Sequence, residues 1–95
     1  MVTDTETFAL ATGVSAEQFL ALEDAIQSWS YLNRKGLRRR TTARGGDGQW
    51  LVLTWWDDAT FAVGLDSMTN APEVAAWRAA IDAASYRRAS YQLLA

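Results

Sequence analysis

The sequence contains no cysteine and no histidine, and it has a single proline among its 95 residues. The lack of cysteine excludes disulfides, thiolate metal sites and a cysteine nucleophile. The lack of histidine removes the usual general base near neutral pH, the commonest metal ligand and the ligand typical of many haem sites. We therefore expect neither a metal nor a cofactor, and ordinary acid–base machinery has few candidates.

Long hydrophobic runs are also missing, and nothing in the sequence approaches the length of a membrane span. The first six residues show no positive charge followed by an apolar run, so no signal peptide is visible. These absences lead us to expect a cytoplasmic protein that does not bind a membrane. A hydrophobic content of 49% favours an ordered chain, which we expect to form one domain over residues 1–95.

The net charge is −2, yet the basic residues are concentrated in one short segment. Such a cluster predicts either a phosphate-binding stripe or an edge strand that is protected by charge. Because the chain as a whole is acidic, we do not expect nucleic acid as a partner. Six of the nine basic residues belong to this segment: Arg34, Lys35, Arg38, Arg39, Arg40 and Arg44.

The segment Gly45–Asp58 predicts a glycine turn, then a strand, then two aspartates that can cap a helix. The strand, Gln49–Trp56, is apolar on both faces, so it belongs in the middle of a sheet that is covered on both sides. Alternation places Trp50, Val52, Thr54 and Trp56 on one face, and Leu51, Leu53 and Trp55 on the other.

Before this strand the pattern predicts a strand over Glu6–Thr12, a helix and a second strand over Leu37–Arg44. The helix opens with a capping box and ends before Gly36, a residue suited to a left-handed conformation. Its apolar stripe contains Phe19, Leu22, Ile26 and Trp29, and Leu20 and Leu32 widen it.

After the central strand the pattern predicts two helical segments and a last strand over Ser85–Leu94. The first helical segment begins near Ala59, is marked by Phe61, Leu65 and Met68, and ends near Asn70. Pro72 can begin the second, whose buried stripe holds Val74, Trp77, Ile81 and Ala84.

The resulting order, strand, helix, strand, strand, helix, strand, predicts a ferredoxin-like α+β sandwich. Its four-stranded antiparallel sheet carries both helical segments on one face, with the first and third strands in the middle. Leu51, Leu53 and Trp55 then lie on the open face, where a bare apolar surface marks an interface. We expect a homodimer in which two sheets close face to face.

The segment from Gly48 to Asp58, with Pro72–Arg78 after it, resembles the antibiotic biosynthesis monooxygenase family of dimeric α/β barrels. The resemblance implies oxidation of a tricyclic phenol by O₂, without metal or flavin, in a pocket between the helices and the sheet. It also implies catalytic roles for the residues that match the family's strand-end Trp and helical Arg, which are Trp56 and Arg78. The family's Asn position falls on Val52, and its Tyr position falls near Ala62.

Further candidates for substrate contact come from residues near Trp56. Val52 and Thr54 share its strand face, and Phe61 follows it along the chain. Tyr86 and Arg88 face one way on the last strand and can add a phenol and a cation to the same pocket. No carboxylate pair is indicated as an acid–base couple, because Asp57 and Asp58 are explained as caps.

Three functions remain open. The first is a cofactor-independent oxygenase that holds a flat aromatic molecule between Trp56, Thr54 and Arg78. The second is a non-catalytic dimer that binds a small ligand in the same fold. The third is an RNA-binding module that presents Trp55 on its open sheet face, although the expected basic and aromatic run is absent from the central strand. Dimerisation through that face separates the third function from the first two.

Overall fold

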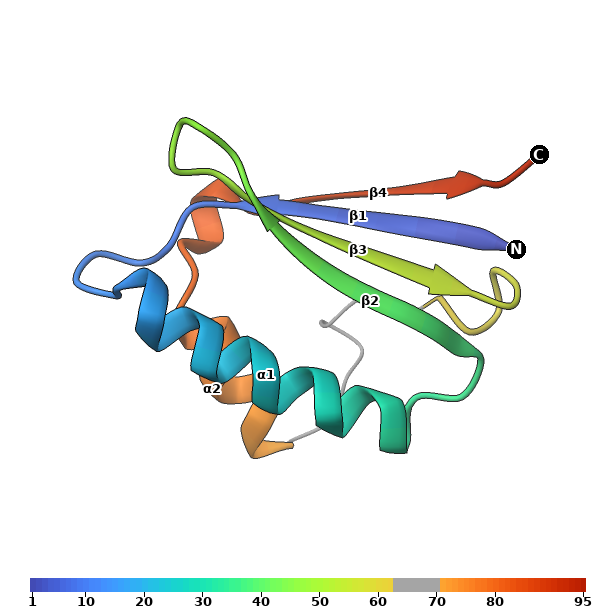
Figure 1. Cartoon of the computed structure of the whole chain (residues 1–95), viewed down its shortest axis with the longest axis horizontal. Coiled ribbons are helices and arrows are strands. Elements are labelled where there is room, and N and C mark those ends of the chain that lie inside the picture. The colour runs from blue at the N-terminus through green and yellow to red at the C-terminus, as the bar shows by residue number, and fades with distance from the viewer. Residues whose placement is uncertain (63–70) are drawn as a thin grey trace.

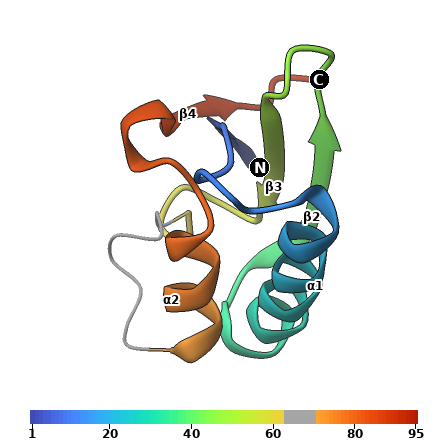
Figure 2. The same cartoon turned by 90° about the vertical axis from the view of Figure 1, so that its left-hand side faces the viewer.

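A computed structural model describes residues 1–62 and 71–95. The described residues form a four-stranded antiparallel sheet in the order β2-β3-β1-β4, and α1 and α2 lie side by side on one face of it (Figures 1 and 2). The predicted ferredoxin-like fold, with the first and third strands in the middle, is confirmed. The elements are β1 (Val2–Phe8), α1 (Ala16–Asn33), β2 (Leu37–Arg44), β3 (Trp50–Trp56), α2 (Pro72–Ala79), a 3₁₀ turn η2 (Ala83–Ser85) and β4 (Arg87–Gln92).

An aromatic cluster fills one end of the space between the sheet and the helices. Phe19 of α1 contacts Trp50 of β3 at a ring-centroid distance of 4.9 Å. Phe8 of β1 lies edge-on to both Phe19 and Trp77 of α2, at 5.5 and 5.1 Å. These ring contacts connect α1, α2 and the sheet.

The helix α1 begins as its sequence predicts. Ser15 accepts a hydrogen bond from the amide of Gln18, and the Gln18 side chain accepts one from the amide of Ser15. Phe19 and Ile26 are buried, as expected for the apolar stripe. The widening of that stripe was wrong, because Leu20 is 49% and Leu32 is 86% exposed. The buried positions that continue the stripe are instead polar: Glu23 and Ser30.

Several element boundaries differ from the prediction. The first strand is Val2–Phe8 rather than Glu6–Thr12, and beyond it Leu10 forms an isolated bridge with Ile81. The helix begun by Pro72 ends at Ala79, so Ala84 lies in the exposed η2 turn instead of on a buried stripe. The last strand is shorter than Ser85–Leu94 and runs from Arg87 to Gln92.

The helix predicted to begin near Ala59 falls mostly on residues 63–70, which lie outside the described residues. Over 57–62 the chain forms turns, and the carboxylate of Asp58 accepts a hydrogen bond from the amide of Thr60 at 2.7 Å. The hydrogen bond that the Thr60 hydroxyl donates to the same carboxylate, together with the bond from the amide, lowers the pKa of Asp58. The other aspartate, Asp57, pairs with Arg38 instead of capping a helix.

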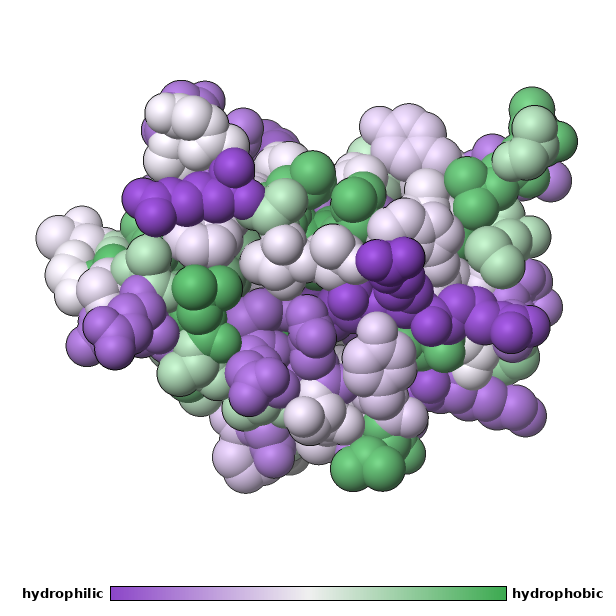
Figure 3. Space-filling model, viewed as in Figure 1, coloured by the Kyte–Doolittle hydropathy of each residue, from purple (hydrophilic) through white to green (hydrophobic). Residues whose placement is uncertain are grey.

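Four of the six residues of the basic segment lie in the edge strand β2, as the charge-protected interpretation predicted, and Arg34 and Lys35 precede it. A register shift between Leu37 and Arg39 breaks the alternation, so Arg38 lies exposed beside Asp57 while Arg40 points inward. Figure 3 shows hydrophilic side chains gathered across the middle of the face on which α1 lies beside β2. Much of the basic segment is therefore used in contacts within the chain.

Candidate functional site

The helix-facing side of the sheet is polar in its middle. Asp4 lies opposite Thr54 in the register of β1 and β3, and Arg40 lies opposite Thr54 in the register of β2 and β3. In the next row, Glu6 lies opposite both Val52 of β3 and Arg88 of β4. Asp4, Glu6, Arg40 and Thr54 are all buried. Burying this many charged groups is costly unless each has a partner, so their partners define the chemistry of the interior.

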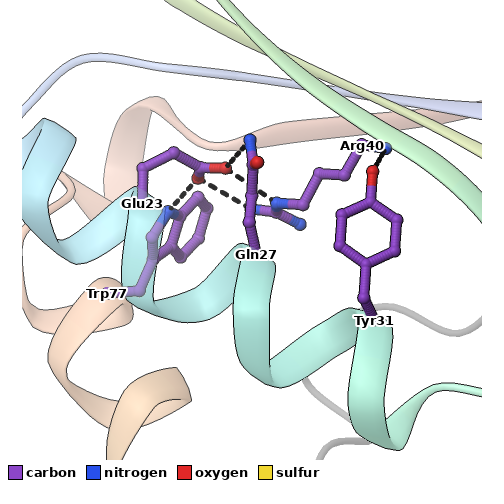
Figure 4. Close-up of polar contacts among 5 residues, drawn as sticks. All are labelled: Glu23, Gln27, Tyr31, Arg40 and Trp77. Atoms are coloured by element: carbon purple, nitrogen blue, oxygen red, sulfur yellow. Dashed lines mark hydrogen bonds and ion pairs between the residues drawn. The ribbon is translucent and has the colours of Figure 1, made fainter.

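The first partnership joins α1, β2 and α2 (Figure 4). Both nitrogens of the Arg40 fork, Nε and Nη2, donate to the two oxygens of Glu23 at 2.9 Å. Trp77 Nε1 donates to the same carboxylate at 2.8 Å, and Gln27 Nε2 donates to it at 3.1 Å. The hydroxyl of Tyr31 accepts the backbone N–H of Arg40 at 2.8 Å.

This pair is fixed in its charged form. Burial acts to raise the pKa of Glu23, but the hydrogen bond and positive charge of Arg40 outweigh it, so the pKa of Glu23 lies below its ordinary value. Burial likewise acts to lower the pKa of Arg40, and Glu23 reverses this, so that pKa is raised. A carboxylate so fully bonded is a structural anchor, not a group free to exchange protons.

The second partnership lies on β1 and β4. The carboxylate of Asp4 accepts hydrogen bonds from Arg88 Nη2 at 2.7 Å and from the hydroxyl of Ser90 at 2.6 Å. The hydroxyl of Tyr86 donates to Glu6 Oε2. The structure therefore places Tyr86 and Arg88 on the same side of the sheet, as their sequence pattern predicted, and joins each of them to a buried carboxylate.

Trp56 lies at the end of β3 on this same side and is 1% exposed. The guanidinium carbon of Arg34, the residue that ends α1, lies 4.4 Å from the centroid of the Trp56 ring. The indole nitrogen Nε1 of Trp56 is buried and has no hydrogen-bond partner among the described residues. A buried donor without an acceptor is costly, so this nitrogen marks a place where a ligand oxygen would be stabilised.

Arg34 brings positive charge to the same place. Burial lowers the pKa of Arg34 to about 10, and the positive charge of Arg40 acts in the same direction. The negative charges of Glu6 and Asp4 oppose this shift, so the guanidinium interacts with both carboxylates of β1. It stays protonated near neutral pH and can stabilise an ionised oxygen beside Trp56.

The sequence-predicted site residues divide into two groups. Val52, Thr54 and Trp56 share the buried face of β3, and Tyr86 reaches the neighbouring row through Glu6. Phe61 lies at the margin, where its ring packs against Gly36 and the amine of Lys35 lies 5.8 Å from the ring centroid.

Arg78 is exposed on α2, next to the buried Trp77. The cation that lies over Trp56 is Arg34, which no sequence pattern indicated as a site residue. The buried carboxylates of Asp4, Glu6 and Glu23 were not indicated either. One pattern could have indicated the two carboxylates of β1. Every second residue from Thr3 to Thr7 is a threonine, and this alternation is typical of a strand that would place Asp4 and Glu6 on its other face.

The described residues contain no group of three His, Cys, Asp or Glu side chains that could hold a metal ion. Within residues 1–62 and 71–95, no helix is long and apolar enough to cross a membrane. The chemistry that the described interior can offer is a buried carboxylate, a phenol, a guanidinium and an indole N–H, arranged along one side of a sheet.

Solved structures share this fold. SnoaB, a cofactor-independent oxygenase from Streptomyces nogalater, matches with a TM-score of 0.74 and 16% identity over 99% of this chain and 93% of that chain. A protein from Deinococcus radiodurans, named as a candidate antibiotic biosynthesis monooxygenase, matches with a TM-score of 0.59 and 15% identity over 100% and 94%. A dimeric protein of unknown function from Bacteroides fragilis, described as having a ferredoxin-like fold, matches with a TM-score of 0.62 and 16% identity over 97% and 95%.

No family model and no curated protein sequence matches this chain. Identities of this size show a shared fold, and the fold implied by the resemblance to antibiotic biosynthesis monooxygenases is thereby confirmed. Whether the chemistry is shared depends on the residues of the site.

Proposed function

We propose that this protein is a cofactor-independent monooxygenase that acts on a small, flat aromatic molecule between the helices and the sheet. The observation that carries the proposal is the buried, unpartnered indole N–H of Trp56, with the guanidinium of Arg34 over its ring. Together they offer a hydrogen bond and a positive charge to an ionised substrate oxygen. The fold shared with a cofactor-independent oxygenase supports the same proposal.

The reaction needs a substrate that can supply all the electrons. An aromatic methylene flanked by two rings loses two hydrogens and gains one oxygen as a carbonyl. The second atom of O₂ leaves as water, so the four electrons that reduce O₂ come from the substrate. The role of the protein is to bind the aromatic rings, to stabilise the anion that reacts with O₂ and to exclude bulk water.

Each candidate side chain has a role in this proposal. Trp56 donates to the substrate oxygen, and Thr54 and Val52 line the same strand face. Tyr86 and Phe61 border the site at its two margins. Arg34 and Arg78 are alternative cations for the substrate anion, and the contact with Trp56 favours Arg34.

Oxygen uptake with a small panel of anthrones and dihydroquinones tests the proposal. We expect turnover by the wild type and a loss of at least tenfold in Trp56→Phe, which is about 1.4 kcal/mol of transition-state stabilisation. Arg34→Ala should lose more activity than Arg78→Ala. No turnover of any panel member above the rate in buffer would reject the oxygenase and favour the non-catalytic ligand-binding dimer.

We also propose that the protein is a homodimer through its open sheet face. Leu51, Leu53 and Trp55 form a column of half-buried side chains along β3 on that face, and the guanidinium of Arg39 lies 5.6 Å from the Trp55 ring. A second copy would cover this column and complete the burial of a strand that is apolar on both faces. The dimeric protein of the same fold from Bacteroides fragilis supports this assembly.

A further inference from the structure

We propose that Glu6 is the general base of the reaction, taking a proton from the substrate before O₂ reacts. This inference rests on the proposed function, because a carbon acid must be deprotonated to become a reductant for O₂. It assigns a catalytic role to a carboxylate of the central strand β1, which the sequence pattern did not indicate.

Three carboxylates are buried among residues 1–62 and 71–95, and they differ in how much of their bonding capacity is used. Glu23 accepts from three side chains, and Asp4 accepts from Arg88 and Ser90. Among the described residues, Glu6 accepts a side-chain hydrogen bond from Tyr86 alone, through Oε2. Its second oxygen, Oε1, accepts no hydrogen bond from another described side chain, whereas both oxygens of Glu23 and both oxygens of Asp4 accept one.

The position of Glu6 also suits a base. It is 5% exposed, on a central strand, and the hydroxyl of Tyr86 fixes the orientation of its carboxylate. A general base needs a fixed position within reach of the substrate proton, and a rigid strand supplies it. The charged and titratable groups around it come from each neighbouring element: Tyr86 and Arg88 beside and on β4, Asp4 on β1, Arg34 after α1 and Arg40 on β2.

A second observation points to a ligand on this side of the sheet. The unpartnered Nε1 of Trp56 lies on the face to which Glu6 belongs, in the row of Val2, four residues along β1 from the row of Glu6. Four residues of strand span roughly 13 Å, at about 3.3 Å per residue. The Trp56 and Glu6 side chains are long enough to cover much of this distance, so a fused-ring molecule that lies along the strands can place an oxygen at Trp56 while its acidic carbon lies toward Glu6.

The proton and electron balance of the reaction requires no reagent other than the substrate and O₂. Glu6 removes one proton from the methylene carbon and leaves a carbanion, which forms a carbon–oxygen bond with O₂ and becomes a peroxide anion. The proton on Glu6 passes to the outer oxygen. Loss of the remaining C–H proton then breaks the oxygen–oxygen bond, giving the carbonyl and water.

Proton exchange in the absence of O₂ isolates the first step. Anthrone is incubated in D₂O under argon, and the exchange of its methylene protons is followed by NMR with wild type, Glu6→Gln and Tyr86→Phe. We expect the wild type to accelerate exchange, Glu6→Gln to lose that acceleration by at least about 100-fold, as is typical for general bases, and Tyr86→Phe to lose it less. Glu17→Gln, at an exposed carboxylate of α1, is the matched control.

The outcomes separate this inference from the proposed function. If the wild type exchanges protons but consumes no O₂, and Glu6→Gln does neither, the oxygenase is rejected while Glu6 remains the base. If Glu6→Gln is folded by circular dichroism and keeps wild-type exchange, Glu6 is not the base, whatever the oxygen uptake shows. If Glu6→Gln unfolds, Glu6→Met, which also lacks a carboxylate, replaces it, and unchanged exchange in folded Glu6→Met overturns the inference. Absence of accelerated exchange by the wild type rejects both.

Discussion

Two buried tryptophans offer a direct comparison at the scale of single residues. Trp56 and Trp77 are 1% and 0% exposed, but the indole N–H of Trp77 donates to Glu23 while that of Trp56 has no acceptor among the described residues. In a chain that only needed to fold, both indoles would be expected to have acceptors. The difference is what a ligand-binding donor would produce.

Replacing each of these tryptophans with phenylalanine should therefore affect different properties. Trp77→Phe removes one of the two hydrogen bonds to Oε1 of the charged Glu23, so it should cost about 1.5–3 kcal/mol more in the free energy of unfolding than Trp56→Phe. Trp56→Phe should have the larger effect on kcat/KM. Urea unfolding measures which variant is less stable, and oxygen uptake measures which variant has the lower kcat/KM. If Trp56→Phe were the more destabilising variant and no less active, Trp56 would be a packing residue only.

The residues that sequence reasoning missed are polar residues at buried positions. Glu23 and Ser30 follow Phe19 and Ile26 at four-residue steps, so they lie on the predicted stripe, but a search for apolar side chains passed over them. Asp4 and Glu6 alternate with threonines, so β1 shows no contrast between an apolar and a polar face and its start was placed too late. Hydrophobic periodicity does not predict buried charged residues, because the partners that stabilise them come from elsewhere in the chain.

At the scale of elements, the Glu23–Arg40 pair connects α1 to β2, and the indole of Trp77 adds α2. Arg40→Met would leave the buried Glu23 carboxylate without its cation, and such a loss costs about 3–5 kcal/mol. The double variant Glu23→Leu with Arg40→Met removes both charges and should be more stable than Arg40→Met. Urea unfolding of Arg40→Met and of the double variant measures this, and a double variant no more stable than Arg40→Met would contradict it.

The same pair predicts how stability depends on pH. The folded-state pKa of Glu23 lies below its ordinary value of 4.5, so its contribution is fully present above that value. It is lost as the pH falls below 4.5 through the folded-state pKa, because the unfolded chain then binds more protons. In Glu23→Gln this part of the acid dependence should disappear. An unchanged slope of unfolding free energy against pH below 4.5 would contradict the assignment.

The turn after α1 depends on Gly36, which has a φ of +79° and packs against the ring of Phe61. Gly13 has a similar φ of +86°, but a Cβ there would meet nothing within 4 Å. Alanine at either position should cost about 1–2 kcal/mol for the left-handed backbone. Gly36→Ala should cost about 1–3 kcal/mol more, because its Cβ would overlap Phe61. Thermal unfolding compares the stabilities of Gly36→Ala and Gly13→Ala. Equal losses of stability would show that a Cβ at position 36 does not overlap Phe61.

For the whole molecule, the sequence predicted the element order, the strand order and the two faces of β3, because these follow from periodicity and short connections. Trp50, Val52, Thr54 and Trp56 are buried under the helices, as alternation required. The site was less predictable. Arg34 reaches Trp56 from the end of α1, 22 positions away in the sequence, and no local pattern indicates such a contact.

The proposed dimer can be tested by changing its central face. We expect the wild type to have twice the 10.5 kDa mass of one chain in solution, measured by light scattering after size exclusion. Trp55→Glu should shift it toward the monomer, because a charge would be buried against the partner sheet. Leu20→Glu replaces an apolar residue that is 49% exposed on α1 and should leave the dimer intact. A Trp55→Glu variant that stays dimeric would place the interface elsewhere.

The central claim, that this fold oxygenates a carbon acid with O₂ alone, is tested most directly by isotope labelling. Anthrone is incubated with the wild type under ¹⁸O₂ in unlabelled water, and the product is analysed by mass spectrometry beside an identical sample without protein. We predict a carbonyl product that carries one ¹⁸O atom, formed faster than in the sample without protein and with one O₂ consumed per product. Labelled product formed no faster than without protein would contradict the claim.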